Sequence, residues 1–404
     1  MNVWYICKYV SYPGHGYVGM RGYYLMHELS KLGCNVDLIT STASSFLGKG
    51  KAAEIVNISP NFSFHQLVGH QYEKVGSIAR IFSWLEFEIK VLLCSKKKLK
   101  RPDVIIASSL SILSIINGFI WSKIYGAKLV FEVRDIWPLT LTEEGGFSKS
   151  NPFIVALGFL ERWGYKVSDL IVGTMPNLKA HVASVCKAET SKVICVPIGI
   201  PDDVSNPFFS AGVVRHQLRK NKFVIGYVGT VGTTNALDTL FSALGRIDLA
   251  KQDIECHVVG GGPLLEYYLE KYSHIANLSF FGHVEKENVA KIISSFDVVY
   301  FSTFRSEVWD YGQSLNKIID YMLAGKPILG SYSGYPSMVN EANCGWFVRA
   351  EDPTALSNKI LSLSMYDKEA LASIGRKGAS WIQNNRKYSS LASQLLDHIK
   401  KMVD

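Results

Sequence analysis

Short apolar segments alternate with longer amphipathic ones along this chain of 404 residues. The run from Val3 to Cys7 is typical of a buried strand, and the spacing after the following glycine loop predicts a helix over 22–32. Val36 to Thr40 reads as the next strand. Further strands of this half are predicted at 104–107, 128–133 and 170–173, with helices between them. This alternation predicts an α/β fold with a doubly wound parallel sheet.

A second strand–helix series begins at Phe223 and forms another Rossmann-like domain. Its predicted strands are 223–228, 255–259, 278–281, 298–301 and 327–330. The stretch from Pro197 to Lys222 is rich in Pro, Gly, Asp and Asn, which is typical of a linker. We therefore expect an N-terminal domain over 1–200, a second over 201–380, and a final helical segment, 381–404, that packs back on the first. Ligands of such sheets bind beyond the carboxyl ends of the strands.

Composition narrows the class of protein without choosing a function. A single hydrophobic core stops growing at roughly 250 to 300 residues, so this length also favours two domains. The net charge of +8 favours an anionic partner but does not say which one. Seven scattered cysteines without a CxxC pair predict a reduced, cytoplasmic protein with no metal site. The N-terminus does not resemble a signal peptide. The uncharged run from Val104 to Ser122 does not resemble a membrane span, because it contains five serines and Asn117.

The glycine loop after the first strand matches GxGxxG at Gly14, Gly16 and Gly19. A dinucleotide site would also need an acidic residue at the end of the second strand, where this chain has Thr40, Ser41 and Thr42. We therefore expect no cofactor. The alternatives are a loop that contacts an anion, with Arg21 beside it, or a tight turn that needs glycine.

Polar residues stand at several predicted strand ends. Arg134 and Asp135 follow the strand 128–133, where an α/β sheet places its chemistry, although Arg and Asp could also form a structural ion pair. In the second domain, the turn 260–262 could hold a phosphate or a base, and His283 could face the same site or lie in the core.

The segment from Tyr311 to Pro327 carries the most information. Ser314 or Asn316 can cap a helix whose positive end, together with Lys317, would face a diphosphate, and Asp320 lies one turn further on. The alternative is a capped amphipathic helix with a solvated lysine.

In order along the chain, FEVRDIWP, VICVPIGIP, VIGYVGTVG, VVGGGP, FFGHV and NKIIDYMLAGKPIL resemble glycosyltransferase family 4. The similar subgroup contains bacterial enzymes of O-antigen and capsule assembly, including L-fucosamine transferases. The resemblance implies a GT-B fold, with two Rossmann-like domains facing a central cleft, and retaining transfer without a metal. It implies a UDP-sugar with an N-acetylated sugar as donor and a polyprenyl-diphosphate-linked sugar as acceptor. The family's two glutamates, which have seven residues between them, correspond here to Gly312 and Asp320.

The resemblance and the motifs together assign the site residues. The catalytic candidates are Asp135, Lys317 and Asp320, and Arg21 and Arg134 are candidates for acceptor contact. Basic residues found in many family members after the first glycine turn of the second domain are missing, which leaves Lys317, with Arg305 as a second choice, to neutralise the leaving diphosphate. No DxD triplet occurs that would indicate a divalent ion. The donor-binding candidates are Gly16, Gly19, Gly229, Gly232, Gly261, Gly262, His283, Arg305, Ser314 and Asn316.

A peripheral membrane surface is expected in the first domain, where an apolar stretch, 81–93, precedes the basic cluster 96–101. The alternative is a core helix that ends in solvated charges. A nucleic-acid-binding module would rely on the same lysines, but no partner motif accompanies them, so we expect no nucleic acid. An epimerase of the UDP-sugar 2-epimerase type, which shares the GT-B architecture, is the main alternative activity.

Overall fold

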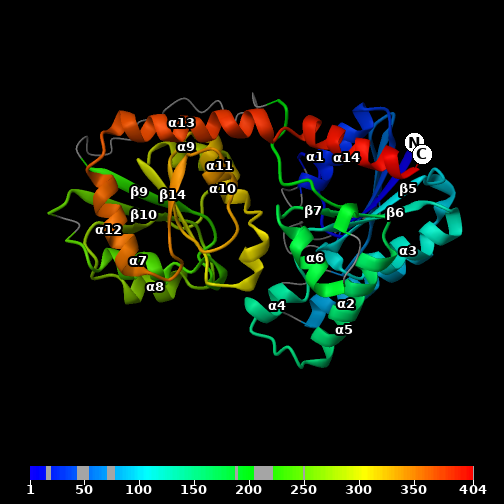
Figure 1. Ribbon diagram of the computed structural model, residues 1–404, viewed down its shortest axis with the longest axis horizontal. Coiled ribbons are helices and arrows are strands. Elements are labelled where there is room, and N and C mark those ends of the chain that lie inside the picture. Colours follow the sequence, from blue (N-terminus) through cyan, green and yellow to red (C-terminus); the bar gives the residue numbers. More distant parts are fainter. Residues whose placement is uncertain are drawn as a thin grey trace. The chain divides into compact units, whose positions relative to one another are not determined.

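The computed structural model describes residues 1–14, 20–42, 54–70, 78–186, 190–203, 222–248 and 251–403. The chain forms two compact units (Figure 1). Unit 1 comprises Met1–Pro201 and Tyr388–Asp404, and unit 2 comprises Asp202–Lys387. The two doubly wound parallel sheets expected from the sequence are confirmed, one in each unit.

The sheet of unit 1 has eight strands in the order β3-β4-β2-β1-β5-β6-β7-β8, and only β3 runs antiparallel to its neighbour. The order reverses at β1, as it does in doubly wound folds. The strands are β1 (Asn2–Ile6), β2 (Asn35–Ser41), β3 (Glu54–Ser59), β4 (Phe62–Leu67), β5 (Val104–Ser108), β6 (Lys128–Val133), β7 (Leu170–Gly173) and β8 (Val193–Cys195).

Helices cover both faces of this sheet, and the alternation of side chains along β1 shows why. Val3 and Tyr5 belong to the core cluster shared with α1 and α14, whereas Trp4 and Ile6 belong to a cluster that includes residues of α2. The helices of unit 1 are α1 (Met20–Lys31), α2 (Ile78–Leu93), α3 (Ser114–Tyr125), α4 (Leu139–Glu143), α5 (Pro152–Val167), α6 (Leu178–Cys186) and α14 (Tyr388–Val403).

The last helix, α14, packs against α1 and returns the end of the chain to unit 1 (Figure 1). Its buried face consists of Tyr388, Leu391, Ala392, Leu395, Leu396 and Ile399. The returning segment begins later than the expected residue 381, because Trp381 still lies in α13 (Lys368–Asn385) of unit 2.

Unit 2 contains six parallel strands in the order β11-β10-β9-β12-β13-β14. They are β9 (Phe223–Val228), β10 (Ile254–Val259), β11 (Leu278–Phe280), β12 (Val298–Ser302), β13 (Ile328–Ser331) and β14 (Gly345–Val348). The helices are α7 (Asp238–Leu244), α8 (Leu265–Lys271), α9 (Lys286–Ser294), α10 (Asn316–Leu323), α11 (Met338–Glu341), α12 (Pro353–Ser364) and α13. The order reverses between β9 and β12, so the ends of these two strands mark the expected ligand position of unit 2.

Within the described ranges, no helix is long and apolar enough to span a membrane. The uncharged run from Val104 to Ser122 forms β5, a short 3₁₀ turn and most of α3.

Candidate active site

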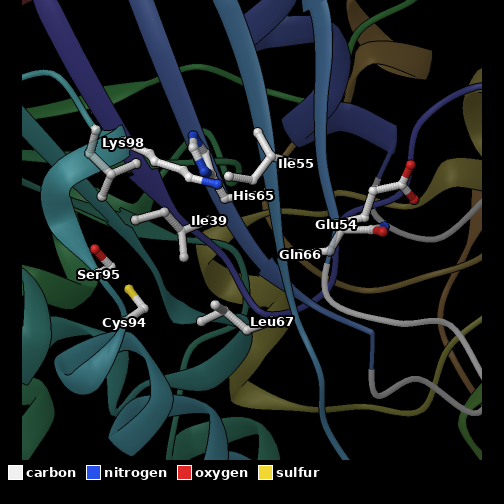
Figure 2. A pocket seen from close by; sticks show the side chains of 10 residues that line it. Ile39, Glu54, Ile55, His65, Gln66, Leu67, Cys94, Ser95 and Lys98 are labelled. Carbon is white, nitrogen blue, oxygen red and sulfur yellow. The ribbon is translucent and has the colours of Figure 1, made fainter.

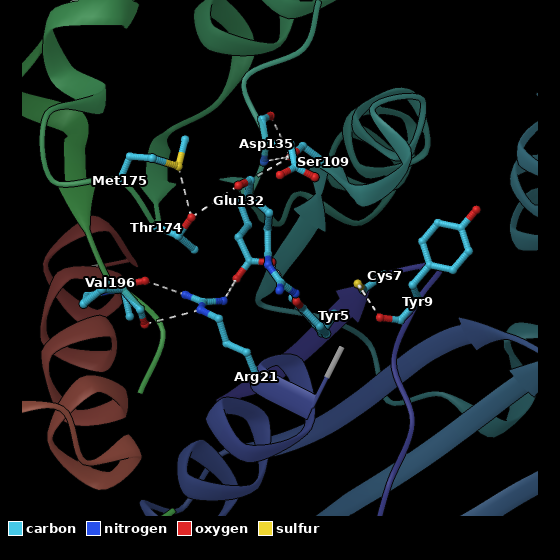
Figure 3. A network of polar contacts seen from close by, with 12 residues as sticks. Tyr5, Cys7, Tyr9, Arg21, Ser109, Glu132, Asp135, Thr174, Met175 and Val196 are labelled. Carbon is cyan, nitrogen blue, oxygen red and sulfur yellow. Dashed lines mark hydrogen bonds and ion pairs between the residues drawn. The ribbon is translucent and has the colours of Figure 1, made fainter. Parts of the chain in front are cut away.

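A buried ionic network lies beneath the carboxyl end of β6 in unit 1 (Figure 3). Glu132 forms an ion pair with Arg21 and accepts a hydrogen bond of 2.6 Å from the hydroxyl of Tyr5. Burial alone would raise the pKa of Glu132, but Arg21 and Arg134 outweigh burial and hold that pKa below its ordinary value. Glu132 is therefore an ionised carboxylate enclosed by cations.

Arg21 has a structural role in this network. Its side chain is only 2% exposed, and besides the ion pair its guanidinium donates to the carbonyl oxygens of Val196, at 2.6 Å, and Pro197. It thus joins α1, β6 and the segment after β8. The expected contact of Arg21 with the acceptor stays a prediction, and the hydrogen bonds of its guanidinium to Glu132, Val196 and Pro197 are all within unit 1.

Arg134 and Asp135 follow β6 and differ in environment. Burial disfavours the charge of Arg134, but Glu132 outweighs burial and raises the pKa of Arg134 above its ordinary value. The Nη1 group of Arg134 is buried and has no hydrogen-bond partner in the described part of the chain. Asp135 is exposed, and the hydroxyl of Ser109 accepts from the amide of Arg134 at 2.9 Å, which holds this turn. An exposed carboxylate beside an arginine with a free donor is suited to binding a polar ligand.

A second carboxyl group that the sequence reasoning missed accompanies Asp135. Glu144 follows α4, and burial, then the charge of Asp135, raise its pKa to about 7. No motif marks Glu144, because its relation to Asp135 depends on how the chain folds between them.

In unit 2, the first glycine turns after β9 and β10 pack directly against each other. A Cβ atom at Gly260 would collide with the carbonyl oxygen of Gly229, and one at Gly262 with that of Val231. The amide of Val231 donates to the oxygen of Gly261 at 2.8 Å. These glycines are needed for close backbone approach. Gly232 begins the short 3₁₀ turn Thr233–Asn235.

Lys317 lies in the first turn of α10 and reaches this glycine platform. Its ammonium donates to the hydroxyl of Tyr227 at 3.2 Å and to the side chain of Asn235, and it lies over the Tyr227 ring, 4.9 Å from the centroid. A Cβ at Gly229 would stand 3.6 Å from this nitrogen. Burial lowers the pKa of Lys317 to about 8. The structure thus brings together Lys317 and Gly229, with Tyr227 and Asn235 as partners that the motif did not indicate.

The remaining predicted donor residues do not all lie at this platform. His283 is exposed, so it is not a core histidine, and its Cβ would lie 3.7 Å from a Cβ at Gly261. Asp320 lies one turn after Lys317 on α10. Arg305 is held elsewhere, at the end of β14, where Nε donates to the oxygen of Ala350 at 3.1 Å and pairs with Glu351 at 4.0 Å. Gly16 and Gly19 lie outside the described residues.

The expected helix cap is wrong. The residue before α10 is Leu315, and no side chain caps the helix; Asn316 is its exposed first residue. The hydroxyl of Ser314 is instead buried without a hydrogen-bond partner among the described residues.

Other buried polar groups of unit 2 also lack partners among the described residues. Gln313 is 6% exposed, and neither atom of its side-chain amide is hydrogen-bonded within the described ranges. The same holds for the hydroxyl of Thr303 and the indole nitrogen of Trp309. Buried polar groups are nearly always hydrogen-bonded, so the amide of Gln313 is a candidate for contact with a polar ligand. Gln313 follows Gly312, the position that corresponds to the first family glutamate. This adjacency was the only feature of the sequence that pointed to Gln313.

No group of three or more His, Cys, Asp or Glu side chains in the described part of the chain is placed to hold a metal ion.

Comparison with known proteins agrees with this geometry. Residues 222–365 match the family Glycosyl transferases group 1. Probable glycosyltransferase WbjE of Pseudomonas aeruginosa is 23% identical over 322 residues, which cover 78% of each chain. Sucrose-phosphate synthase of Thermosynechococcus elongatus superposes with a TM-score of 0.76 at 17% identity, over 99% of this chain and 98% of that one. The fold is GT-B. The family match and the relative support a glycosyltransferase of group 1.

The protein HepE of Anabaena has also been solved in complex with UDP. It is 14% identical to this chain, with a TM-score of 0.68 over 99% of this chain and 100% of that one. Another structure of HepE contains UDP-glucose.

Proposed function

We propose that this protein is a retaining, metal-independent glycosyltransferase of family 4. It transfers an N-acetylated hexose or deoxyhexose from a UDP-sugar to a polyprenyl-diphosphate-linked saccharide in O-antigen or capsule biosynthesis. The observation that carries the proposal is the ammonium of Lys317 beside the Gly229 turn. A UDP donor is supported by HepE, whose structures hold UDP and UDP-glucose.

The chemistry assigned to Lys317 follows from charge. A leaving nucleoside diphosphate gains negative charge as the glycosidic bond breaks, and a fixed cation in a water-poor site stabilises that charge. The amides of the first turn of α10 add positive potential at the same place. Asp320 lies one turn further along α10, where we expect its carboxylate to contact the donor.

We assign acceptor activation to Asp135 in unit 1, with Arg134 as a contact for the acceptor. Because Asp135 is exposed, Asp135→Asn is expected to preserve the fold while lowering kcat at least about 100-fold, the usual effect of losing a general base. Thermal unfolding and kcat should be measured together. A variant that unfolds at a lower temperature but is normally active per folded molecule would make Asp135 structural.

The proposal is tested by incubating the purified protein with a panel of radiolabelled UDP-sugars and a lipid-linked acceptor fraction. Transfer of label to the lipid phase, with unchanged activity in EDTA, is expected. Conversion of the UDP-sugar to its epimer without acceptor would indicate the epimerase instead. Loss of activity in EDTA that added magnesium or manganese restores would refute the metal-independent mechanism.

We further propose that unit 1 docks on the cytoplasmic face of the inner membrane through α2. The side chains of Trp84, Phe87 and Val91 are buried, whereas Phe82, Leu85, Ile89 and Leu93, which are 45% to 79% exposed, occupy the opposite face. This exposed apolar stripe ends beside a lysine cluster, which is the combination found in interfacial helices.

A further inference from the structure

Unit 1 has a pocket of about 490 Å³ outside the network at β6 (Figure 2). One wall consists of the neighbouring strands β2, β3 and β4, and the other is the segment that follows α2, residues 94–99. None of the residues assigned to sugar transfer lines this pocket.

The interior of the pocket is mainly apolar. Ile39, Leu67 and Leu99 line it and also pack in the cluster beneath α2. Ile55 of the edge strand β3 is 41% exposed beside them. In Figure 2, Ile39, Ile55 and Leu67 extend toward the pocket, whereas Glu54 and Gln66 point away. Apart from the imidazole of His65, the groups that the sheet presents to a ligand are therefore hydrocarbon.

Two polar groups at the rim have no partner in the described part of the chain: the hydroxyl of Ser95 and the ammonium of Lys98. Two other ionisable side chains nearby, those of His65 and Lys96, already have partners. His65 pairs with Asp37 at 2.7 Å, and Lys96 donates to the carbonyl oxygens of Val91 and Cys94 at 2.7 and 2.8 Å. Among the described residues, the rim thus offers the ammonium of Lys98 and the hydroxyl of Ser95, which match an anionic head group, whereas the carboxylate of Glu54 points away.

We propose that this pocket binds one acyl chain of an anionic membrane lipid, with the phosphate of the lipid at Lys98 and Ser95. The pocket continues the apolar surface of α2, because Leu92 and Leu93, 38% and 79% exposed, immediately precede Cys94 and Ser95 at its wall. The site is separate from the residues assigned to sugar transfer. It would hold the lipid through apolar contact with the acyl chain and through the charge of Lys98.

Cys94 provides a direct measurement, because it lines the pocket and is a free thiol. Alkylation by N-ethylmaleimide is followed by mass spectrometry of the full-length protein, with monomeric dodecyl phosphate as the probe. A ligand enclosed by the pocket would also cover the thiol of Cys94, which lines it. We therefore expect the rate of alkylation at Cys94 to fall about fivefold or more at saturation. Two half-buried thiols, Cys195 of the opposite edge strand β8 and Cys186 at the end of α6, serve as internal controls and should not change.

Two variants separate the contributions of charge and chain. Lys98→Ala should raise the half-protecting concentration about two- to fivefold, the effect of one ion pair near a surface, while Lys97→Ala, which does not line the pocket, should leave it unchanged. Ile55→Ser should weaken protection because it removes part of the apolar wall.

Vesicles then test the source of the ligand. Phosphatidylcholine vesicles containing phosphatidylglycerol should protect Cys94, and phosphatidylcholine alone should not. The proposal is overturned if dodecyl phosphate leaves the rate at Cys94 unchanged, if inorganic phosphate alone protects as well, or if dodecyl maltoside protects equally. Because the readout is alkylation, failure of the sugar-transfer proposal would not alter it.

Discussion

Lys317 is the residue that we propose to meet the diphosphate of the donor, and its pKa of about 8 predicts a pH dependence of activity. The ammonium carries its charge below that pH and loses it as the pH rises, so kcat/KM for the donor should fall above about pH 8. Lys317→Arg should remove this falling limb, because arginine stays charged, while recovering only part of the rate.

Lys317→Ala should lower kcat/KM by roughly 30- to 1000-fold, which corresponds to about 2 to 4 kcal/mol of lost transition-state stabilisation. Arg305→Ala is the control, since Arg305 is held by Ala350 and Glu351. Activity of Lys317→Ala within about twofold of wild type, together with a collapse in Arg305→Ala, would transfer the diphosphate role to Arg305.

Gln313 is expected to contact the donor through its unpartnered amide. Gln313→Leu should raise the donor KM by roughly 5- to 150-fold, because the donor loses one or two hydrogen bonds worth about 1 to 3 kcal/mol. The free energy of unfolding without ligand should stay the same or increase, because an unpaired buried amide is removed. A marked loss of stability with unchanged KM would show that the amide is structural.

At the scale of elements, α2 separates a buried face from an exposed apolar one, and this division predicts how it meets a membrane. Replacing Phe82 and Ile89 by Ser should reduce binding to anionic vesicles at least about tenfold, since each inserted side chain contributes about 1 kcal/mol or more. Leu269→Ser, on the exposed face of α8 in unit 2, is the matched control. Vesicle co-sedimentation at constant salt measures the difference, and equal binding of the two proteins would exclude α2 as the anchor.

The lysines after α2 are not equivalent. Lys96 is bound to carbonyl oxygens at the end of the helix and lies over the ring of Trp121, and Lys100 donates to Asn35. Replacing either one would disturb unit 1 itself. Lys97 is the position whose replacement probes the membrane charge alone, at about 1 kcal/mol, because Lys98 also lines the proposed lipid pocket.

For the whole molecule, the return of α14 makes the stability of unit 1 depend on the last residues of the chain. A protein that ends at Lys387 would lose the buried side chains of three leucines and Ile399, worth roughly 6 to 12 kcal/mol, which is comparable to the entire stability of a domain. We expect calorimetry to show loss of the unit 1 transition while that of unit 2 remains.

A point variant provides the graded version of this test. Leu395→Ala should destabilise unit 1 by about 2 to 5 kcal/mol, whereas Ser393→Ala on the exposed side of α14 should stay within about 0.5 kcal/mol of wild type. An unaltered unit 1 transition in the truncated protein would mean that α14 only covers a surface.

The sequence by itself determined the two α/β series, because apolar runs with a period of two or 3.6 record which faces are buried. It also determined that Lys317, Gly229 and Asp135 lie at the ends of helices and strands, because these positions follow from the local pattern. What surrounds these residues was decided by the tertiary structure alone. Asn235 and Lys317 are 82 residues apart in the sequence, and Arg21 and Glu132 are 111 apart, yet each pair is in contact. Local spacing therefore could not show that Lys317 gains partners or that Arg21 is buried. The unpaired amide of Gln313 is likewise a property of packing, because a polar side chain lacks a hydrogen-bond partner only when its neighbours bury it away from water.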